Sequence, residues 1–407
     1  MNNSLLIIAV SSLSSLFAVR WIYFWVLKVA KNKGVVDNPG TRKLHKEPIP
    51  VMGGMAVFFG ILAGVLMGTA VGCVERSIIS SQLLPVICSM AVLHYIGSLD
   101  DLADLNPFGR LFMEIGAVAV LIVATGCSID NFGGLWSIGY LPYWVSFVLT
   151  VFAGVGIINA INMVDGVNGL ASTLCIMTCL FFGVTFFRAD CLSDAVIAFC
   201  AASAILPFVI HNLFGRSSRM FLGDAGTMPL GLLIAYFVTR AIGSGCVVEQ
   251  LSSEGKSMIS FSLAVLSLPV FDALRVMTMR AIGGRSPFRP DKTHLHHLFI
   301  SMQFGHLSTT LCEIVLNLLV FAAWSVSTSL GASVDVQLYV VIGAAAIFIW
   351  GTSILLQADW FARSRFVRWL QERHEKSSES RERFYSKLAG MLDAPEKRIK
   401  PGPESES

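Results

Sequence analysis

Residues 83–110 read LLPVICSMAVLHYIGSLDDLADLNPFGR and contain the two features on which the predicted architecture depends. The stretch begins as an apolar run of the length that crosses a bilayer, which takes about 17–25 residues. It ends in three carboxylates, Asp100, Asp101 and Asp104. An ionisable group placed where lipid begins is costly and usually serves a function. The stretch therefore predicts a membrane-spanning helix that carries an acidic cluster at one end.

The composition of the whole chain also indicates a membrane protein. Of 407 residues, 54% are hydrophobic and 14% are charged, whereas soluble domains carry about 25% charged residues. The formal net charge of +3 is too small to indicate nucleic acid as a partner. The nine cysteines are scattered and form no CxxC pair. We therefore expect them to be small apolar residues of the spans, without a disulfide framework or a zinc site.

Similar apolar runs recur along most of the chain, which predicts an all-α, polytopic integral membrane protein with about eleven transmembrane helices. The first run follows MNNS without a basic segment or a cleavage site, so we expect it to be retained rather than removed as a signal peptide. No repeat of 20–50 residues is evident, which argues against an inverted-repeat transporter. The predicted spans are 4–27, 53–72, 83–99, 111–126, 142–159, 170–187, 192–213, 227–240, 257–274, 310–328 and 337–356.

Lysine and arginine are distributed unevenly between the two sides of these spans. The loops that follow the odd-numbered spans, together with the tail, hold most of them. The opposite loops hold only Arg76, Arg188, Arg240 and Lys256. Positive charge accumulates on the cytoplasmic side of a membrane protein. We therefore predict that the N-terminus lies outside and the C-terminus in the cytoplasm.

The chain divides into a transmembrane domain, 1–357, and a cytoplasmic tail, 358–407. The tail begins ADWFARSRFVRWLQERHEK, in which aromatic residues alternate with arginines. This pattern fits an amphipathic helix lying on the anionic inner leaflet, and it fits a solvated basic tail equally well. The Pro, Glu and Ser residues near the end predict disorder there.

Five polar segments stand out, and all of them fall on the predicted cytoplasmic side. The first is RKLHKEPIPVMGG, residues 42–54, with Arg42, Lys43 and His45 ahead of a glycine pair that opens the second span. Cations before a helix start suit an anionic ligand, because free N–H groups and the helix dipole favour negative charge there. Alternatively, these basic residues only fix the topology.

The second segment is the acidic cluster of the opening stretch. On a helix, Asp104 projects between Asp100 and Asp101, and Asn106-Pro107 then ends the helix. Three carboxylates this close repel one another unless a cation or a proton offsets them. Oxygen ligands of this kind suit Mg²⁺ or Mn²⁺. The alternative is a solvated acidic loop.

The third segment is NAINMVDGVNGLA, residues 159–171. Asn159, Asn162 and Asp165 recur every three residues and form a polar stripe at the end of the fifth span. Such a stripe can bind a metal-phosphate unit or sugar hydroxyls, or it can join two helices by hydrogen bonds. Gly166 and Gly169 are predicted to break the helix before the next span.

The fourth segment is RSSRMFLGDAGTMPLG, residues 216–231, in which Arg216 and Arg219 precede Asp224. An acid in a glycine turn can hold a metal while backbone amides approach a phosphate. The competing interpretation is that Asp224 simply caps the helix that follows.

The fifth segment is SPFRPDKTHLHHLF, residues 286–299. Its three histidines, His294, His296 and His297, are compatible with zinc. However, Arg289 and Lys292 lie beside them, so binding a pyrophosphate or a uracil-ribose by hydrogen bonds and positive charge is at least as natural.

These five segments, in this order, resemble the motifs of the polyprenyl-phosphate N-acetylhexosamine-1-phosphate transferases, glycosyltransferase family 4. The resemblance is greatest to the bacterial WecA/TagO branch, which starts O-antigen, enterobacterial common antigen or teichoic-acid linkage units. The matching motifs are RKLHKEPIPVMGG, LDDLADL, NAINMVDGVNGL, FLGDAG and RPDKTHLHH, within residues 35–300 or so. The HxHH form of the last motif favours the branch that uses UDP-GlcNAc.

The resemblance implies that undecaprenyl phosphate attacks the β-phosphorus of a UDP-N-acetylhexosamine, releasing UMP, with Mg²⁺ or Mn²⁺ required. It implies catalytic roles for Asp100, Asp101 and Asp165. It implies metal binding by Asp224, aided by Asp100 and Asp101. The residues that it implies for substrate binding are Arg42, Lys43, His45, Asn159, Asn162, Arg219, Arg289, His294, His296 and His297.

Two positions depart from the family pattern, since Asn168 stands where many relatives have a second aspartate and Thr227 stands where serine is common. The expected location is the bacterial inner membrane, with the active site facing the cytoplasm and the lipid bilayer as a partner. A homodimer is left open. Two alternatives also stay open, namely another UDP-N-acetylhexosamine as substrate, or an ion-coupled transporter, since carboxylates near spans also mark ion paths.

Overall fold

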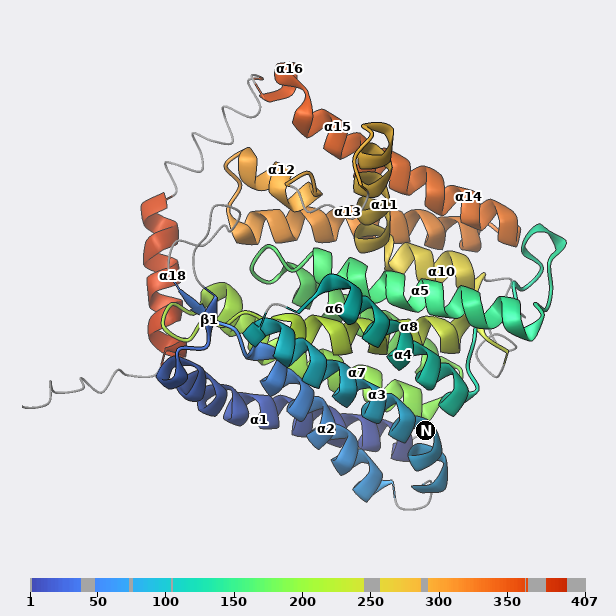
Figure 1. The fold of residues 1–407 in the computed structure, drawn as a ribbon, viewed down its shortest axis with the longest axis horizontal. Helices are drawn as coiled ribbons and strands as arrows, with labels where there is room; N and C mark the ends of the chain where they lie inside the picture. The colour runs from blue at the N-terminus through green and yellow to red at the C-terminus, as the bar shows by residue number, and fades with distance from the viewer. Residues whose placement is uncertain are drawn as a thin grey trace, which may run out of the picture.

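The computed structural model describes residues 2–37, 48–72, 76–103, 105–244, 257–286, 292–362, 364 and 378–393. Within these residues the chain is almost entirely helical, and its one sheet pairs two short strands, β1 (Val36–Asp37) and β2 (Ile49–Pro50). Most helices run side by side through a single bundle (Figure 1). The prediction of an all-α, multi-pass membrane protein is confirmed.

Ten helices in the described part of the chain are long and apolar enough to cross a membrane, and a bent pair makes an eleventh. Every predicted span overlaps one of them. They are α1 (Asn2–Lys33), α2 (Gly53–Val71), α3 (Arg76–Ala103), α4 (Pro107–Thr125), α5 (Tyr143–Met163), α6 (Leu170–Arg188), α7 (Leu192–Phe214), α8 (Asp224–Ile242), the bent pair α10 (Met258–Val265) and α11 (Ser267–Ile282), α13 (His306–Ser329), and the run formed by α14 (Val334–Ala345), a π-helical turn (Ala346–Trp350) and α15 (Gly351–Gln357).

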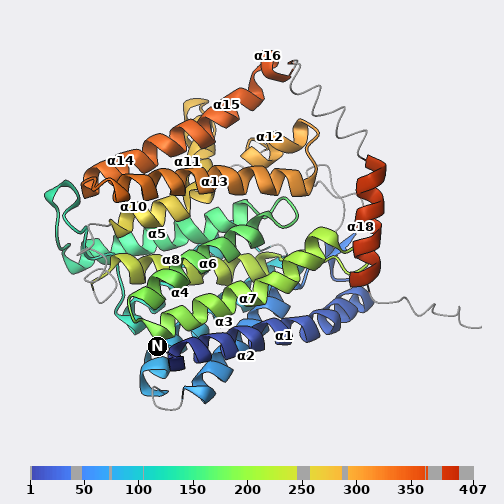
Figure 2. The ribbon, with the colours of Figure 1, turned by 180° about the vertical axis from the view of Figure 1, so that it is seen from behind.

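Helix α8 forms the centre of the bundle. In its most apolar window 94% of the residues are buried, against 22% in α1, which lies at the edge. Helices α3 and α5 pack closely along α8, and α1 and α2 pack on α7 (Figures 1 and 2). The first residue of α8 is Asp224, so the centre of the fold presents this carboxylate at one end of the bundle.

Two glycines allow neighbouring helices to approach the start of α8. A Cβ atom on Gly97 of α3 would lie 2.3 Å from the carbonyl oxygen of Asp224, and one on Gly54 of α2 would lie 2.3 Å from the backbone nitrogen of Gly226. Any side chain at these positions would push the helices apart, because real Cβ atoms do not approach backbone atoms so closely. Glycine therefore sets the distance between the acidic end of α3 and Asp224.

The ninth predicted span, 257–274, is not one straight helix. Helices α10 and α11 meet at Leu266 at an angle of 78°. Figure 1 shows α11 crossing the general direction of its neighbours. Pro269, in the first turn of α11, has no N–H to donate to the preceding turn. The bend turns the second half of this span toward the short helix α12 (Leu295–Ser301).

Part of the tail forms a helix that packs on the bundle. Helix α18 (Ser378–Leu392) crosses the end of the bundle opposite the N-terminus, as both views show (Figures 1 and 2). Tyr385 of α18 stacks on Phe214 at the end of α7. Asp393 accepts hydrogen bonds from the backbone N–H groups of Ser217 and Ser218 at 3.1 and 3.0 Å, and from the Ser218 hydroxyl at 2.6 Å. This segment of the tail is docked on the loop that leads to α8.

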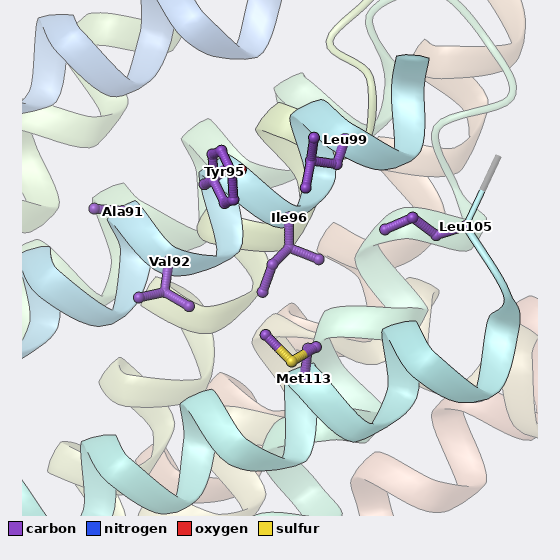
Figure 3. Close-up of a pocket in the computed structure, with 7 residues that line it drawn as sticks. All are labelled: Ala91, Val92, Tyr95, Ile96, Leu99, Leu105 and Met113. Atoms are coloured by element: carbon purple, nitrogen blue, oxygen red, sulfur yellow. The ribbon is translucent and has the colours of Figure 1, made fainter. Parts of the chain in front are cut away.

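An apolar groove of about 510 Å³ runs between α3 and α4 (Figure 3). Its end nearest the acidic cluster is formed by Leu99, Leu105 and Met113. None of the described residues that line it carries a charged side chain, so this lining suits an apolar chain. The remaining lining residues are Ala91, Val92, Tyr95 and Ile96.

Candidate active site

The turn between α3 and α4 fixes Asp100. Helix α3 ends at Ala103, and the Asn106 side chain caps α4 by accepting the N–H of Phe108 at 2.9 Å, with Pro107 in the first helical position. Asp100 Oδ1 accepts the N–H of Leu105 at 2.7 Å. The predicted stop at Asn106-Pro107 is confirmed, and the turn leaves Asp100 Oδ2 directed toward Arg110.

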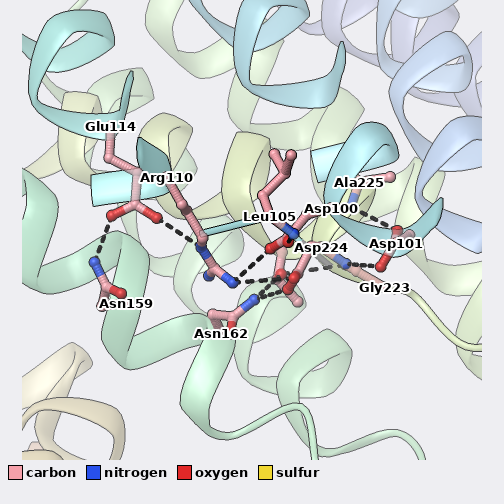
Figure 4. Close-up of polar contacts among 11 residues, drawn as sticks. Asp100, Asp101, Leu105, Arg110, Glu114, Asn159, Asn162, Gly223, Asp224 and Ala225 are labelled. Carbon is pink, nitrogen blue, oxygen red and sulfur yellow. Dashed lines mark hydrogen bonds and ion pairs between the residues drawn. The ribbon is translucent and has the colours of Figure 1, made fainter. Parts of the chain in front are cut away.

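Arg110 joins the carboxylates of two distant segments. One of its terminal nitrogens lies 3.0 Å from Asp100 Oδ2 and 3.0 Å from Asp224 Oδ2 (Figure 4). Its Nε donates to Glu114 Oε1, one helical turn further along α4, at 3.1 Å. All three acids are at least partly buried, where ion pairs are screened less than at a surface. The guanidinium thus compensates the acids that meet at the end of the bundle.

Asp224 also contacts the polar stripe of α5. The Asn162 side-chain amide donates to Asp224 Oδ1 and to the hydroxyl of Thr227, the latter at 2.7 Å. One turn away, Asn159 donates to Glu114 Oε2 at 2.5 Å. The two asparagines therefore bind the acids that Arg110 pairs with, so segments separated by more than a hundred residues form one network (Figure 4).

Asp101 has a different role from its neighbour. Its two carboxylate oxygens accept the backbone N–H groups of Asp224 and Ala225, at 2.9 and 3.0 Å. Gly223, which precedes them, has φ +70°, and a Cβ there would lie 2.5 Å from Asp101 Oδ2. Asp101 therefore caps the N-terminus of α8 from another helix, where negative charge is favourable. The idea that Asp224 caps its own helix is wrong, because the Asp224 side chain points to Arg110 and Asn162.

Asp165 lies just beyond the end of α5, beside this network. Burial raises its pKa well above the ordinary value, and the charges of Asp224 and Asp101 raise the pKa further. The chain turns sharply after it, since Gly169 has φ +78° and α6 begins at Leu170. The predicted break of the helix at Gly166 and Gly169 is confirmed, because α5 ends at Met163 and α6 begins only at Leu170. The raised pKa favours the protonated carboxyl and reflects the negative charge around it, which a bound cation would offset.

The histidine motif reaches the same loop from the other side. A Cβ on Gly166 would lie 2.8 Å from His296 Nε2, so the ring rests against the residue next to Asp165. The rings of His294 and His296 are nearly parallel, with centroids 5.7 Å apart. The ring centroids of His296 and His297 are 4.4 Å apart. The structure therefore brings the fifth segment to the third.

The other predicted site residues have no direct contact with the acidic network among the contacts described above. Arg219 lies in the loop between α7 and α8, within electrostatic range of Tyr23 and His306. The backbone of Asn168 contacts His306 and Thr310 at the start of α13. The predictions that fall outside the described residues are those for Arg42, Lys43, His45, Asp104 and Arg289.

Two residues of this network were not predicted as site residues from the sequence: Arg110, whose charge indicated only the orientation of the chain, and Glu114. The Arg-x-x-x-Glu spacing at the start of the fourth span was an available signal, because residues four apart share a helix face. Glu114 has no exposed surface, and a carboxylate is rarely buried without a partner.

The oxygen-rich network contains ligands of the kind that divalent cations prefer. Among the described residues, no three His, Cys, Asp or Glu side chains are placed to hold a metal by themselves. Mg²⁺, however, is usually bound by one or two carboxylates together with substrate phosphates and water. Asp100 and Asp224, which already share one cationic group, provide such a pair. The donor set therefore fits a magnesium ion that is completed by a diphosphate substrate.

These features define a multi-pass membrane protein with an acidic, amide-lined site at the ends of its spans. A family model described as glycosyl transferase family 4 matches residues 83–242. Relatives include a decaprenyl-phosphate N-acetylglucosaminephosphotransferase of Mycobacterium tuberculosis, 32% identical over 308 residues that cover 69% of this chain and 72% of that protein. Another is the undecaprenyl-phosphate alpha-N-acetylglucosaminyl 1-phosphate transferase of Escherichia coli K12, 30% identical over 326 residues that cover 77% and 84%. The chain belongs to glycosyl transferase family 4.

Proposed function

We propose that this protein transfers N-acetylglucosamine 1-phosphate from UDP-GlcNAc to a polyprenyl phosphate, undecaprenyl phosphate by preference, and releases UMP. The observation that carries the proposal is the Asp100–Arg110–Asp224 network at the end of the spans, held by Asn162. The relatives named above are called transferases of this kind. Family membership favours this enzyme over an ion-coupled transporter.

The site is suited to a reaction between two anions, which depends mainly on positioning and charge neutralisation. In the proposed reaction a phosphate oxygen of the lipid forms a bond to the β-phosphorus of UDP-GlcNAc, and the bond from that phosphorus to the UMP oxygen breaks. Mg²⁺ or Mn²⁺, held by Asp224 and Asp100, would neutralise the diphosphate charge. Asp101 serves by holding the start of α8, which positions Asp224.

Direct attack by the lipid phosphate is favoured over a phosphorylated aspartate. Both oxygens of Asp101 accept backbone N–H groups, and both oxygens of Asp224 face Arg110 or Asn162. A carboxylate engaged in this way is a poor nucleophile, whereas a phosphate monoester is already ionised. Asp165 is proposed to lie beside the diphosphate, next to Asp101 and Asp224.

The nucleotide sugar is proposed to lie between the stripe of α5 and the histidine motif. Amides and imidazoles there offer hydrogen bonds to hydroxyl, amide and phosphate groups. The residues proposed to bind it are Asn159, Asn162, Arg219, His294, His296 and His297, with Arg42, Lys43, His45 and Arg289 as further candidates.

The distribution of lysine and arginine supports a bacterial inner-membrane location, with this site facing the cytoplasm, the N-terminus outside and the C-terminus inside. There the product would start a cell-envelope polysaccharide such as O-antigen. The second candidate substrate is another UDP-N-acetylhexosamine, because an axial or equatorial hydroxyl changes little in the charge chemistry. A homodimer stays open.

One assay tests the proposal. Membranes containing the protein are supplied with undecaprenyl phosphate, Mg²⁺ and radiolabelled UDP-GlcNAc, and UMP and lipid-linked sugar are followed. Stoichiometric UMP and labelled lipid are expected, and both should disappear when EDTA removes the metal. UDP-GalNAc in parallel tests the second candidate. If no UDP-sugar yields a lipid product, the transferase proposal is overturned.

A further inference from the structure

Helix α11 contacts the histidine motif through Asp272, which lies outside the network formed by Arg110 and its acidic partners. Asp272 Oδ2 lies 2.9 Å from His294 Nδ1 and accepts the N–H of Leu295 at 3.3 Å. Its Oδ1 accepts two bonds from Arg275, at 2.7 and 3.1 Å. Arg275 in turn donates to the Thr293 carbonyl at 2.6 Å. The start of α12 is thus fixed by an acid and a base from one helix.

This group is buried and its charges are matched. Asp272 is 2% exposed, Arg275 5% and His294 6%. Buried charges are tolerated when they are paired and hydrogen-bonded, and such fully satisfied networks hold side chains in one orientation. The contact between α11 and residues 293–295 depends on the 78° bend at Leu266, because the bend directs α11 across the bundle toward these residues. The network therefore fixes the position of a loop that helical packing alone would leave less constrained.

The contact also fixes the orientation of the His294 ring. Because Nδ1 faces the carboxylate, it carries the proton that is donated to Asp272, and Nε2 lies on the opposite edge of the ring. That ring lies nearly parallel to His296, whose Nε2 rests against Gly166 beside Asp165. His296 is 2% exposed, and its Nδ1 has no hydrogen-bond partner among the described residues. A buried polar atom without a partner next to the acidic site is suited to a ligand.

We propose that Asp272 is a positioning residue of the nucleotide-sugar site: with Arg275 it holds His294 and His296 in the orientation that binds the UDP-sugar. The proposal rests on the proposed function. The ligand chemistry is that of a nucleoside diphosphate sugar, whose N–H, hydroxyl and phosphate groups can meet the two imidazoles. Asp272 acts through His294 and does not touch the reacting atoms.

The test compares the two substrates separately. Initial rates of the purified full-length protein are measured with UDP-GlcNAc or undecaprenyl phosphate varied in turn. Asp272→Asn should raise the KM for UDP-GlcNAc about tenfold or more, since small misplacements of binding groups are costly. The KM for undecaprenyl phosphate should stay within about twofold. His294→Gln should show the same pattern, and the double variant should be no worse than His294→Gln alone, because the two residues act as one unit.

A matched control is available at the other end of α8. Asp194 is also buried and is paired with Arg240 at 3.0 Å and with the Tyr236 hydroxyl at 2.5 Å. Asp194→Asn removes a comparable buried charge far from the site. It should lower the unfolding temperature and leave the KM for UDP-GlcNAc unchanged. If Asp272→Asn does not fold, Arg275→Lys is measured for the same KM difference, because it keeps the charge but loses the fork that reaches Thr293.

Several outcomes would overturn the proposal. A wild-type KM for UDP-GlcNAc in Asp272→Asn, or an equal rise in both KM values, would mean that Asp272 only stabilises the fold. So would additive effects in the double variant with His294→Gln. In these cases the wild-type protein still makes product, so the proposed function stands. An inactive wild-type protein would overturn both.

Discussion

At the scale of single residues, adjacent aspartates have separate roles. Asp100 pairs with Arg110, whereas Asp101 caps α8 through two backbone N–H groups. Successive residues of a helix point about 100° apart, so neighbours in sequence face different elements. Asp224 and Asp100 share Arg110, and their carboxyl groups also lie within hydrogen-bonding reach of each other. A pair of acids that appears as one motif in the sequence is therefore divided between a charge network and a structural cap.

Asp224→Asn should abolish most of the activity while preserving the fold. The variant keeps the shape of the side chain but removes the charge that faces Arg110 and would bind the metal. Loss of such an electrostatic contact costs about 10²–10³ in kcat. Lipid product formation with Mg²⁺ varied measures this loss. Asp190→Asn is the control, because Asp190 lies in the exposed turn between α6 and α7. Undiminished turnover in Asp224→Asn would contradict the metal role.

We predict that the stability of the folded protein depends on pH through protonation of His296. Burial, together with the charges of the nearby His297 and His294, lowers the pKa of this ring from 6.5 to about 3. The folded protein therefore keeps this ring neutral while the unfolded chain takes up a proton below about pH 6.5. The contribution of the neutral ring to the free energy of unfolding is fully present above pH 6.5. It declines as the pH falls toward 3, by up to about 1.4 kcal/mol per pH unit.

The measurement is thermal unfolding between pH 7 and pH 4 in detergent. His296→Gln cannot take up a proton, so it should lose less stability over this range than the wild-type protein. At pH 7 the variant should be equally or less stable, because the ring packs against Gly166. Identical pH profiles for the two proteins would show that His296 is already protonated when folded, or accessible to water.

At the scale of elements, hydropathy predicted every span but not the shape of the ninth. A window average records apolar content and is insensitive to a bend between α10 and α11. Pro269 was the available local signal, but proline in the first turn of a helix is common and does not predict a 78° bend. The tail segment 358–376, for which the sequence predicted an amphipathic helix or a solvated tail, lies largely outside the described residues. Further along the tail, α18 packs on α7, a contact that the sequence did not predict.

Removing the Asp393 carboxylate should loosen α18 from the bundle. The N–H groups of residues 216–218 and the Ser218 hydroxyl hold the pKa of Asp393 below its ordinary value, although partial burial opposes this. Asp393→Ala leaves these donors to water and should destabilise the docked helix by about 1–2 kcal/mol. Limited proteolysis of the tail in detergent should become faster.

The matched control for this prediction is Met391→Ala on the same helix. Met391 is 70% exposed, so its truncation should not change the rate of proteolysis. Equal cleavage rates in Asp393→Ala and the wild-type protein would mean that the stacking of Tyr385 on Phe214 is sufficient to hold α18.

At the scale of the whole molecule, the prediction that remains is orientation. Leu330, 80% exposed, lies between α13 and α14 at the end of the bundle away from the active site, and Met391 lies on α18 at the active-site end. In a cysteine-free background, Leu330→Cys should react with an impermeant maleimide in intact spheroplasts. Met391→Cys should react only after the membrane is opened. The reverse pattern would place the active site outside and contradict the charge-based topology.

The sequence alone was enough to assign the class of the protein, because apolar runs and their flanking charges reflect transfer to lipid, which needs no partner segment. It also identified Asp100, Asn162 and Asp224 as polar residues that had to be compensated. The groups that compensate them are seen only in the folded protein, where Arg110 joins Asp100 to Asp224 and Asn162 reaches Asp224 from α5. Glycines at the helix crossings set these distances. Partners one helical turn apart, such as Arg110 and Glu114, can be predicted from their spacing, whereas partners on different helices depend on how whole helices pack.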